Sequence, residues 1–177
     1  MANERYHPAL ITLHWLIAFM LVVAITIGMT VLEDTPNSSP EKIGALKGHM
    51  IGGILILVLT IVRLVVKVTT SNPAPVKTGN PFLAKLGVGI HHGFYFFIIA
   101  MAGSGLATAI AAGLPDIVFG GSGAPLPKDF SQFAARGVHG LIADILVVMV
   151  ILHIAGALVH QFKLKDNLMA RMKFGKK

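Results

Sequence analysis

Four long apolar stretches separated by short polar segments make up most of the chain. They cover roughly Pro8–Leu32, Gly44–Val68, Leu83–Leu114 and Gly137–Phe162. Each is much longer than a strand and has at least the roughly 20 residues that a helix needs to cross the hydrocarbon core of a bilayer. A backbone in lipid must also satisfy its hydrogen bonds within its own segment, as a helix does. The pattern therefore predicts four transmembrane helices.

Turn-forming residues fill the segments between these stretches. The first, Glu33–Ile43, contains DTPNSSPEK, in which Ser39 followed by Pro40 is typical of a helix start. The second, Thr69–Pro81, is dense in proline and glycine, which interrupt helices. The third, Pro115–Arg136, is the longest. The chain is thus expected to reverse direction three times.

Within the third segment we expect a short interfacial helix at Phe130–Arg136. We expect the first apolar stretch to be a retained helix, because it is longer than the apolar region of a signal peptide and lacks a clear small-x-small cleavage site. Four helices joined in this way predict an all-α, integral-membrane, up-down-up-down four-helix bundle. A single domain of this kind accounts for residues 1–177.

Composition supports a membrane protein and excludes several kinds of site. Only 13% of the 177 residues are charged, whereas soluble domains carry about a quarter. The absence of cysteine excludes disulfides, iron–sulfur clusters, thiolate zinc sites and the thioether attachment of a c-type haem. The net charge of +7 raises the question of a nucleic-acid partner, but the position of the charges indicates membrane orientation instead.

Lysine and arginine gather on one side of the predicted bundle. Eleven lie in the N-terminal tail, around the second loop or in the C-terminal tail: Arg5, Arg63, Lys67, Lys77, Lys85, Lys163, Lys165, Arg171, Lys173, Lys176 and Lys177. Four lie on the other side: Lys42, Lys47, Lys128 and Arg136. Because basic residues favour the cytoplasmic side of a membrane, we expect both termini and the second loop in the cytoplasm.

Seven of the eight histidines fall inside the predicted helices, where ionisable residues are costly and mark functional sites, and four of them pair by depth. At 1.5 Å per residue, His14 lies about 9 Å into the first helix, on the cytoplasmic side. His49 lies near the outer end of the second helix. In the fourth helix, His139 lies near the outer end and His153 about 21 Å deeper. Depth thus pairs His14 with His153, and His49 with His139.

The two histidines of the fourth helix also share a face. Fourteen residues amount to nearly four turns, which leaves His139 and His153 within about 40° of each other around the helix axis. Two imidazoles from different helices, present at each of two depths, suit two b-type haems, each with an axial histidine on both faces of the iron. Such ligation leaves no open position on the iron and favours electron transfer over oxygen binding.

Two other interpretations of these histidines stay open. Each one alone can be a buried polar residue that is bonded to a neighbour, although the pairing of all four by depth counts against this. A metal transporter can also use histidines as ion ligands. Zinc, however, prefers three or four neighbouring ligands, and depth supplies two at each level.

The remaining histidines lie near the cytoplasmic side. His7 precedes a proline and is expected just outside the first helix, which makes it a poor axial ligand. His160 lies one heptad beyond His153, and His91 and His92 begin the third helix. Two interpretations are open for His91, His92 and His160. Each either contacts a haem propionate or a quinone oxygen, or simply faces the lipid headgroups.

Other polar residues near the histidines have two interpretations each. Lys47 precedes His49 by two residues, and Arg136 precedes His139 by three. These cations could neutralise haem propionates or attract an anion such as superoxide. Alternatively, they simply extend to the membrane–water interface. Arg63 pairs with a propionate or quinone, or anchors its helix at the cytoplasmic surface. Asp144 lies about 140° around the helix from His139. It is expected to face away from the histidines, in a proton relay or a bond to a neighbouring helix.

Several stretches resemble the bacterial cytochrome b561 family of di-haem, four-helix membrane cytochromes. They are LHWL at Leu13–Leu16, the segment from His49 to IVRLVVK, the start of the third helix at His91, and HIAGALVHQFKLKDNLMARM from His153 to Met172. The resemblance covers nearly the whole chain. It implies that the haem ligands are His14, His49, His139 and His153.

One type of member of this family is a superoxide oxidase, which passes electrons from superoxide outside the membrane to ubiquinone. Other members relay electrons between quinol and a partner protein. The resemblance therefore implies an oxidoreductase of the superoxide:ubiquinone type, with the relay as the alternative, and lipid and ubiquinone as partners. This chain departs from the family pattern at His160-Gln161, where members often have two adjacent histidines, and at Asp144.

Overall fold

The computed structural model describes residues 5–74 and 81–175. Within these ranges the chain is helical without strands, and four helical segments are long and apolar enough to cross a membrane: Pro8–Asp34, Pro40–Thr69, Ala84–Ala111 and Ala134–Leu164. The predicted all-α membrane bundle is thereby confirmed. Three lysines of the orientation argument, Lys77, Lys176 and Lys177, lie outside the described residues.

The first span consists of three helical pieces in series: α1 (Pro8–Thr26), the π-helical turn η1 (Ile27–Val31) and α2 (Leu32–Asp34). His7 lies just before the helix, as expected, and its Nδ1 accepts a hydrogen bond from the backbone N–H of Ala9 at 3.3 Å. This bond satisfies one of the N–H groups that every helix start leaves without an intrahelical partner. His7 therefore acts as a helix cap.

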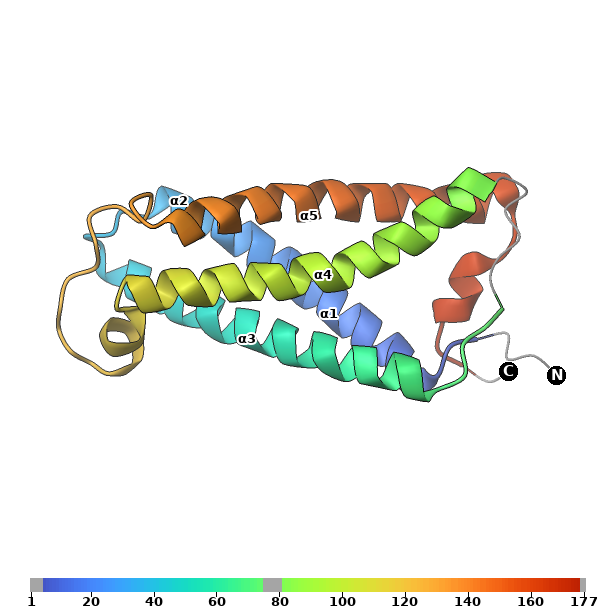
Figure 1. Cartoon of the computed structure of the whole chain (residues 1–177), viewed down its shortest axis with the longest axis horizontal. Helices are drawn as coiled ribbons and strands as arrows, with labels where there is room; N and C mark the ends of the chain where they lie inside the picture. Colours follow the sequence, from blue (N-terminus) through green and yellow to red (C-terminus); the bar gives the residue numbers. More distant parts are fainter. Residues whose placement is uncertain (1–4, 75–80, 176–177) are drawn as a thin grey trace.

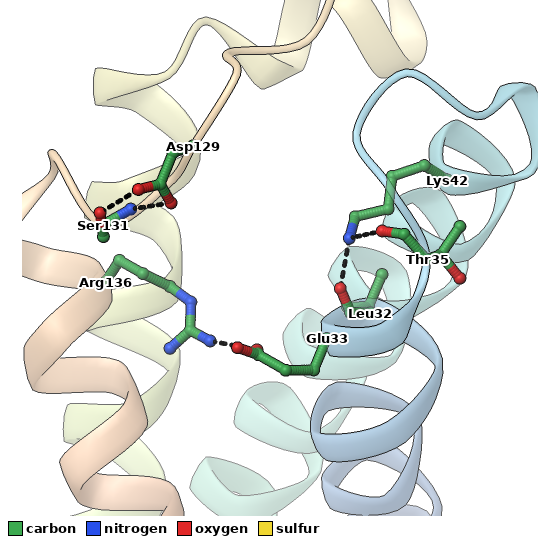
Figure 2. Close-up of polar contacts among 7 residues, drawn as sticks. All are labelled: Leu32, Glu33, Thr35, Lys42, Asp129, Ser131 and Arg136. Carbon is green, nitrogen blue, oxygen red and sulfur yellow. Dashed lines mark hydrogen bonds and ion pairs between the residues drawn. The ribbon is translucent and has the colours of Figure 1, made fainter.

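The second span is α3 (Pro40–Thr69), which begins at the predicted Ser39-Pro40 pair and four residues before the predicted boundary. Its first turn also supports the end of the first span. The buried amine of Lys42 donates hydrogen bonds to the backbone carbonyls of Leu32 and, at 2.7 Å, of Thr35 (Figure 2). Lys42 thus satisfies carbonyl groups that the end of α2 leaves open.

The remaining spans are α4 (Pro81–Ala111) and α5 (Ala134–Leu158), and α5 continues into the π-helical turn η3 (Val159–Leu164). The separate helix predicted at Phe130–Arg136 is wrong. The chain is extended just before α5 begins, so the last three residues of that range are the first turn of α5 itself. The loop instead forms a π-helical turn, η2 (Pro115–Phe119), directly after α4.

The four spans run along the long axis of the molecule in alternating directions (Figure 1). The closest neighbours are α1 with α3, α3 with α4, and α4 with α5. Arg5 and Gly175, near the two chain ends, are joined by a hydrogen bond of 3.1 Å. We call the end that contains them the inner end, and the end that contains the loop 115–133 the outer end, after the predicted orientation.

Two clusters of buried apolar side chains hold the bundle together. The first lies at mid-depth and takes residues from all four spans: Ile17, Leu21, Ile56, Ile98, Ile142 and Leu146. The second lies at the outer end, where the loop residues Leu126, Phe130 and Phe133 pack against α3 and α4. Most other large apolar side chains are exposed, as expected for a surface in contact with lipid.

The chain after α5 folds back across the inner end of the bundle, where η4 (Leu168–Met172) lies beside the start of α1 (Figure 1). The indole N–H of Trp15 donates to the carbonyl of Met172 at 3.0 Å. His160 and Asp166 form an ion pair of 2.6 Å across the reversal. The C-terminal segment therefore covers the inner end of α1.

Candidate functional site

Two pairs of histidine side chains lie at opposite ends of the bundle. At the inner end, the rings of His14 on α1 and His153 on α5 are 6.1 Å apart between centroids, with an angle of 65° between their planes. At the outer end, His49 on α3 and His139 on α5 are 6.2 Å apart, with an angle of 76°. The structure thus brings together the same partners that depth pairs in the sequence.

The mid-depth apolar cluster separates these two pairs. On α5, the buried residues Ile142 and Leu146 lie between His139 and His153 in the sequence. The pairs therefore form two distinct sites. Among the described residues no group of three or more histidine, cysteine or carboxylate side chains could hold a metal ion.

The ring separations fit one metal ion between each pair. A bond from a metal to an imidazole nitrogen is about 2 Å long, and that nitrogen lies about 1 Å from the ring centroid. Two imidazoles that bind opposite sides of one ion therefore have centroids about 6 Å apart, as axial ligands of haem iron do. Both histidine pairs match this requirement.

The outer pair has further features of a ligand site. The Nδ1 of His139 lies 3.0 Å from the carbonyl oxygen of Met101 and 3.1 Å from the hydroxyl of Ser104, both on α4. A proton on Nδ1 that is donated to this carbonyl leaves the lone pair on Nε2, the arrangement typical of a metal-binding histidine. The buried Nδ1 of His49 has no hydrogen-bond partner within the described chain.

Glycines allow close approach to both outer rings. A Cβ atom built on Gly105 would lie 3.0 Å from Cε1 of His139, and one built on Gly28 would lie 3.4 Å from Cε1 of His49. Gly28 belongs to the π-helical turn η1, and such turns occur frequently at functional sites. By contrast, Cβ atoms built on Gly52 and Gly53 would meet no described side chain within 4 Å.

The inner pair lies within a larger group of aromatic rings. His91 on α4 lies 5.4 Å from His153, and Phe94 lies 5.5 Å from the same ring. Trp15 contacts His14 at 5.2 Å. Of the three histidines with open roles, His91 alone joins the pair: Nδ1 of His92 bonds to a carbonyl of its own helix.

His160 lies apart from this group, in its ion pair with Asp166. Partial burial opposes ionisation of Asp166, but the hydrogen bond with His160 and a second one from the backbone N–H of Leu168 outweigh it and lower the pKa of Asp166. His160 therefore links the end of the last span to the C-terminal segment through Asp166. Its contact with a haem propionate or quinone stays a prediction.

Arg63 lies beside the inner pair together with a residue that the sequence did not single out. Its guanidinium donates a hydrogen bond to the hydroxyl of Tyr95. Arg63 and Lys67 also lie over the ring of Tyr95, at 5.5 and 5.3 Å from its centroid. The charge of Arg63 acts on both His14 and His153. Tyr95 follows His91 by one helical turn, so a depth argument extended to phenols would have found it.

The two predicted outer cations have partners in the structure. Arg136 forms an ion pair of 2.9 Å with Glu33, which joins α5 to α2 (Figure 2). The amine of Lys47 lies 5.7 Å from the ring centroid of Phe119. The positive charge of Arg136 is thus partly balanced by a carboxylate, whereas Lys47 contacts an aromatic face and forms no ion pair with a described residue.

The outer loop carries its own polar contact close to Arg136 (Figure 2). The hydroxyl and the backbone N–H of Ser131 both donate to the carboxylate of Asp129, the N–H at 2.8 Å. These hydrogen bonds from Ser131 hold the pKa of Asp129 below its usual value. Asp129 therefore stabilises the turn that leads into α5.

Comparison with known proteins identifies the family. A family model described as prokaryotic cytochrome b561 matches residues 5–175. The probable superoxide oxidase CybB of Yersinia pestis is 26% identical over 172 residues, 96% of each chain. Cytochrome b562 of Cereibacter sphaeroides is 28% identical over 166 residues, 92% of this chain and 90% of the relative. Cytochrome b561 homolog 1 of Escherichia coli is 28% identical over 172 residues, 96% of this chain and 97% of the relative.

The stretches that match these relatives span the whole membrane bundle. Such proteins carry b-type haem and transfer electrons across a membrane. The chain therefore belongs to the prokaryotic cytochrome b561 family and is a multi-pass membrane oxidoreductase that transfers electrons through haem.

Proposed function

We propose that the chain binds two b-type haems and couples the oxidation of superoxide at the outer end to the reduction of ubiquinone at the inner end. His49 and His139 would hold the outer haem, and His14 and His153 the inner one. The observation that carries this proposal is the near-equal separation of 6.1 and 6.2 Å in two histidine pairs at opposite ends of the bundle. The similarity to the Yersinia pestis protein supports the choice of superoxide.

The bound haems would supply one-electron transfer without an open coordination position. Two superoxide ions would each lose one electron and leave as dioxygen. One ubiquinone would gain these two electrons, take up two protons and become ubiquinol. The chain itself must therefore admit a small anion at one end, and must hold a quinone and deliver protons at the other.

The outer end suits a small donor. Leu126, Phe130 and Phe133 of the outer loop pack over the outer apolar cluster, so a protein partner would meet this loop before it met the histidine pair. Lys47 and Arg136 supply positive charge beside the pair, and local positive charge raises the rate at which anions arrive. These features support superoxide over a protein as the donor.

The inner end suits a quinone. Arg63, Tyr95 and His91 place hydrogen-bond donors beside His153, and a quinone oxygen accepts such bonds. The phenol and the imidazole can also pass protons. Lys67 adds a second positive charge beside Tyr95, which favours a group that becomes more negative during reduction. A haem propionate on Arg63 is compatible with the same arrangement.

Orientation completes the proposal. The basic residues around the inner end favour the cytoplasmic side of a bacterial inner membrane, so superoxide would arrive from outside the cell membrane and protons from the cytoplasm. Cysteine-accessibility labelling checks this orientation. The chain has no cysteine of its own, so a thiol reagent reports only Ala134→Cys at the outer end or Phe174→Cys at the inner end. Labelling of Ala134→Cys from the cytoplasmic side would contradict the orientation.

The test of the activity has two steps on the purified, haem-loaded protein. A pyridine haemochrome assay should give two b haems per chain; one haem or none would contradict the ligand assignment. Superoxide consumption is then measured with a short-chain ubiquinone analogue, and we expect one ubiquinol for every two superoxide ions. Two haems together with superoxide loss at the uncatalysed rate would instead leave the electron relay to a partner protein as the function.

A further inference from the structure

Asp144 lies on the outward surface of α5, at a depth between the two histidine pairs. It follows His139 by five residues and precedes His153 by nine, within the apolar part of the span. Its side chain is exposed and forms no hydrogen bond or ion pair with any described residue. A carboxyl group at this depth is costly unless a partner covers it.

The exposed residues around Asp144 follow the spacing of a helix–helix seam. Steps of four and three residues alternate along the outward face of α5 through Leu141, Asp144, Val148, Ile151, Ala155 and Leu158, all of them exposed. An average spacing of 3.5 residues keeps such a row in line with a second helix that crosses at about 20°. This face of α5 therefore has the pattern that a long helix partner requires.

A shallow recess of about 270 Å³ lies beside the carboxylate, lined by Asp144, Ile145, Val148 and Met149. Met149 lies so close to α4 that a Cβ atom built on Gly93 would be 2.9 Å from its terminal methyl carbon. One wall of the recess is thus held in place by packing against α4. An apolar part of a neighbouring helix can pack into this open recess, next to Asp144.

We propose that this face of α5 binds a transmembrane helix of another protein, and that this helix carries a lysine or arginine at the depth of Asp144. Charge complementarity selects this occupant: a basic side chain neutralises the carboxylate. A second copy of the chain, placed symmetrically, would bring two Asp144 carboxylates together, and like charges oppose each other. Since α5 carries one histidine of each pair, the partner helix would lie directly beside both sites.

A resonance energy transfer experiment in vesicles tests the proposal with the haem-loaded chain. The donor dye is attached through Ala134→Cys at the exposed start of α5, because the natural chain has no cysteine. The probe is a polyleucine helix of about 23 residues with an acceptor dye at its outer end and one lysine about 15 Å inside that end, because Asp144 lies about that far from Ala134 at 1.5 Å per residue. The matched probe has leucine in place of the lysine.

We expect transfer to the lysine probe to exceed transfer to the leucine probe at least fivefold. Asp144→Asn should lower it to the level of the leucine probe. The control is Ile54→Asn, which adds the same amide on the exposed face of α3 at the same depth and should leave transfer unchanged. If Asp144→Asn does not yield haem-loaded protein, Asp144→Lys replaces it, and a probe with glutamate should then restore transfer.

Equal transfer to both probes, or transfer that survives Asp144→Asn, would overturn the proposal. So would transfer between donor-labelled and acceptor-labelled copies of the chain that Asp144→Asn abolishes, because the occupant would then be a second copy. A loss of the haem spectrum in Asp144→Asn marks a folding defect, and the Asp144→Lys arm then decides. The outcome does not depend on superoxide or ubiquinone activity, so the two proposals can fail separately.

Discussion

The imidazole of His139 is fixed by α4, through a contact of 3.0 Å between its Nδ1 and the carbonyl oxygen of Met101. Its partner His49 has a buried Nδ1 without a hydrogen-bond partner in the described chain. The two members of the outer pair are therefore held differently. The contact with Met101 orients His139 in advance, whereas the described chain gives the Nδ1 of His49 no hydrogen bond.

The pairing of histidines predicts which substitutions act on the same haem. His49→Ala and His139→Ala should each remove or shift one component of the reduced-minus-oxidised spectrum, and His14→Ala and His153→Ala should each affect the other component. The reason is that each pair lies at one end of the bundle. Redox-titrated absorption spectra of the four variants check this. Selective loss of the same component in His14→Ala and His49→Ala would contradict the pairing.

Gly105→Ala should disturb the outer haem without unfolding the protein. The added Cβ would lie 3.0 Å from Cε1 and 3.2 Å from Nδ1 of His139, closer than ordinary contact, so the ring must tilt. Gly103→Ala on the same helix is the control, because its Cβ would meet no described side chain within 4 Å. Both changes raise helix propensity by about 1 kcal/mol, so a spectral shift confined to Gly105→Ala isolates the contact with His139.

Glu33→Gln should increase the rate of superoxide oxidation at low ionic strength, by about two- to threefold. It removes the carboxylate that pairs with Arg136 at 2.9 Å and exposes the full charge of the arginine to incoming anions. Asp34→Asn changes the net charge equally, and Asp34 forms no ion pair within the described chain. A gain of the same size in Asp34→Asn would show that the faster rate comes from the net charge and not from release of Arg136. The gain should disappear near 1 M salt, where the Debye length is about 3 Å.

Tyr95→Phe should slow quinone reduction by about tenfold, because a hydrogen bond to a charged group contributes about 1.5 kcal/mol or more. The change removes the hydroxyl that accepts a hydrogen bond from Arg63 and keeps the ring beneath both cations. Pre-steady-state kinetics should show an unchanged rate of haem reduction by superoxide and a slower step with the ubiquinone analogue. Equal slowing of both steps would indicate a general structural role for Tyr95.

Acid should release the C-terminal segment. The lowered pKa of Asp166 means that its ion pair stabilises the fold above the ordinary aspartate pKa of about 4, and that this stabilisation is lost as pH falls through the lower pKa of the folded state. Trp15, the single tryptophan, bonds to the carbonyl of Met172 in the same segment, so its emission reports the release. Asp166→Asn should shift the emission already at neutral pH.

Asp129→Asn is the control for this experiment. Asp129 also has a lowered pKa, but it lies in the outer loop, far from Trp15 along the bundle. Its substitution should leave the emission at neutral pH unchanged. Emission of Asp166→Asn that matches the parent protein at every pH would show that the ion pair with His160 does not hold the segment.

The sequence predicts the spans and the histidine pairs well, because both follow from hydropathy and a constant rise per residue. His14 and His153 meet at the inner end for that reason alone. The sequence does not predict the π-helical turn Ile27–Val31, or that Gly28 within it lies against the ring of His49. Such a contact exists only after α1 and α3 have packed.

Local patterns also mislead where the tertiary structure decides. The helical pattern of Phe130–Arg136 looks like a separate helix, but the extended backbone at Phe133 divides it, and only its last three residues are helical. Tyr95 escapes notice because an aromatic residue in an apolar span is usually part of the packing. Its role becomes visible once Arg63 and Lys67, from another helix, lie over its ring.

The position of one histidine of each pair on α5 has a consequence for how the protein can change over time. Substitutions around His14 on α1 act on the inner pair, and those around His49 on α3 act on the outer pair. A rotation or slide of α5 alters both together. Under the proposed ligation, homologues can therefore adjust the inner site around His14 and the outer site around His49 separately, whereas a change in the position of the last span affects both sites.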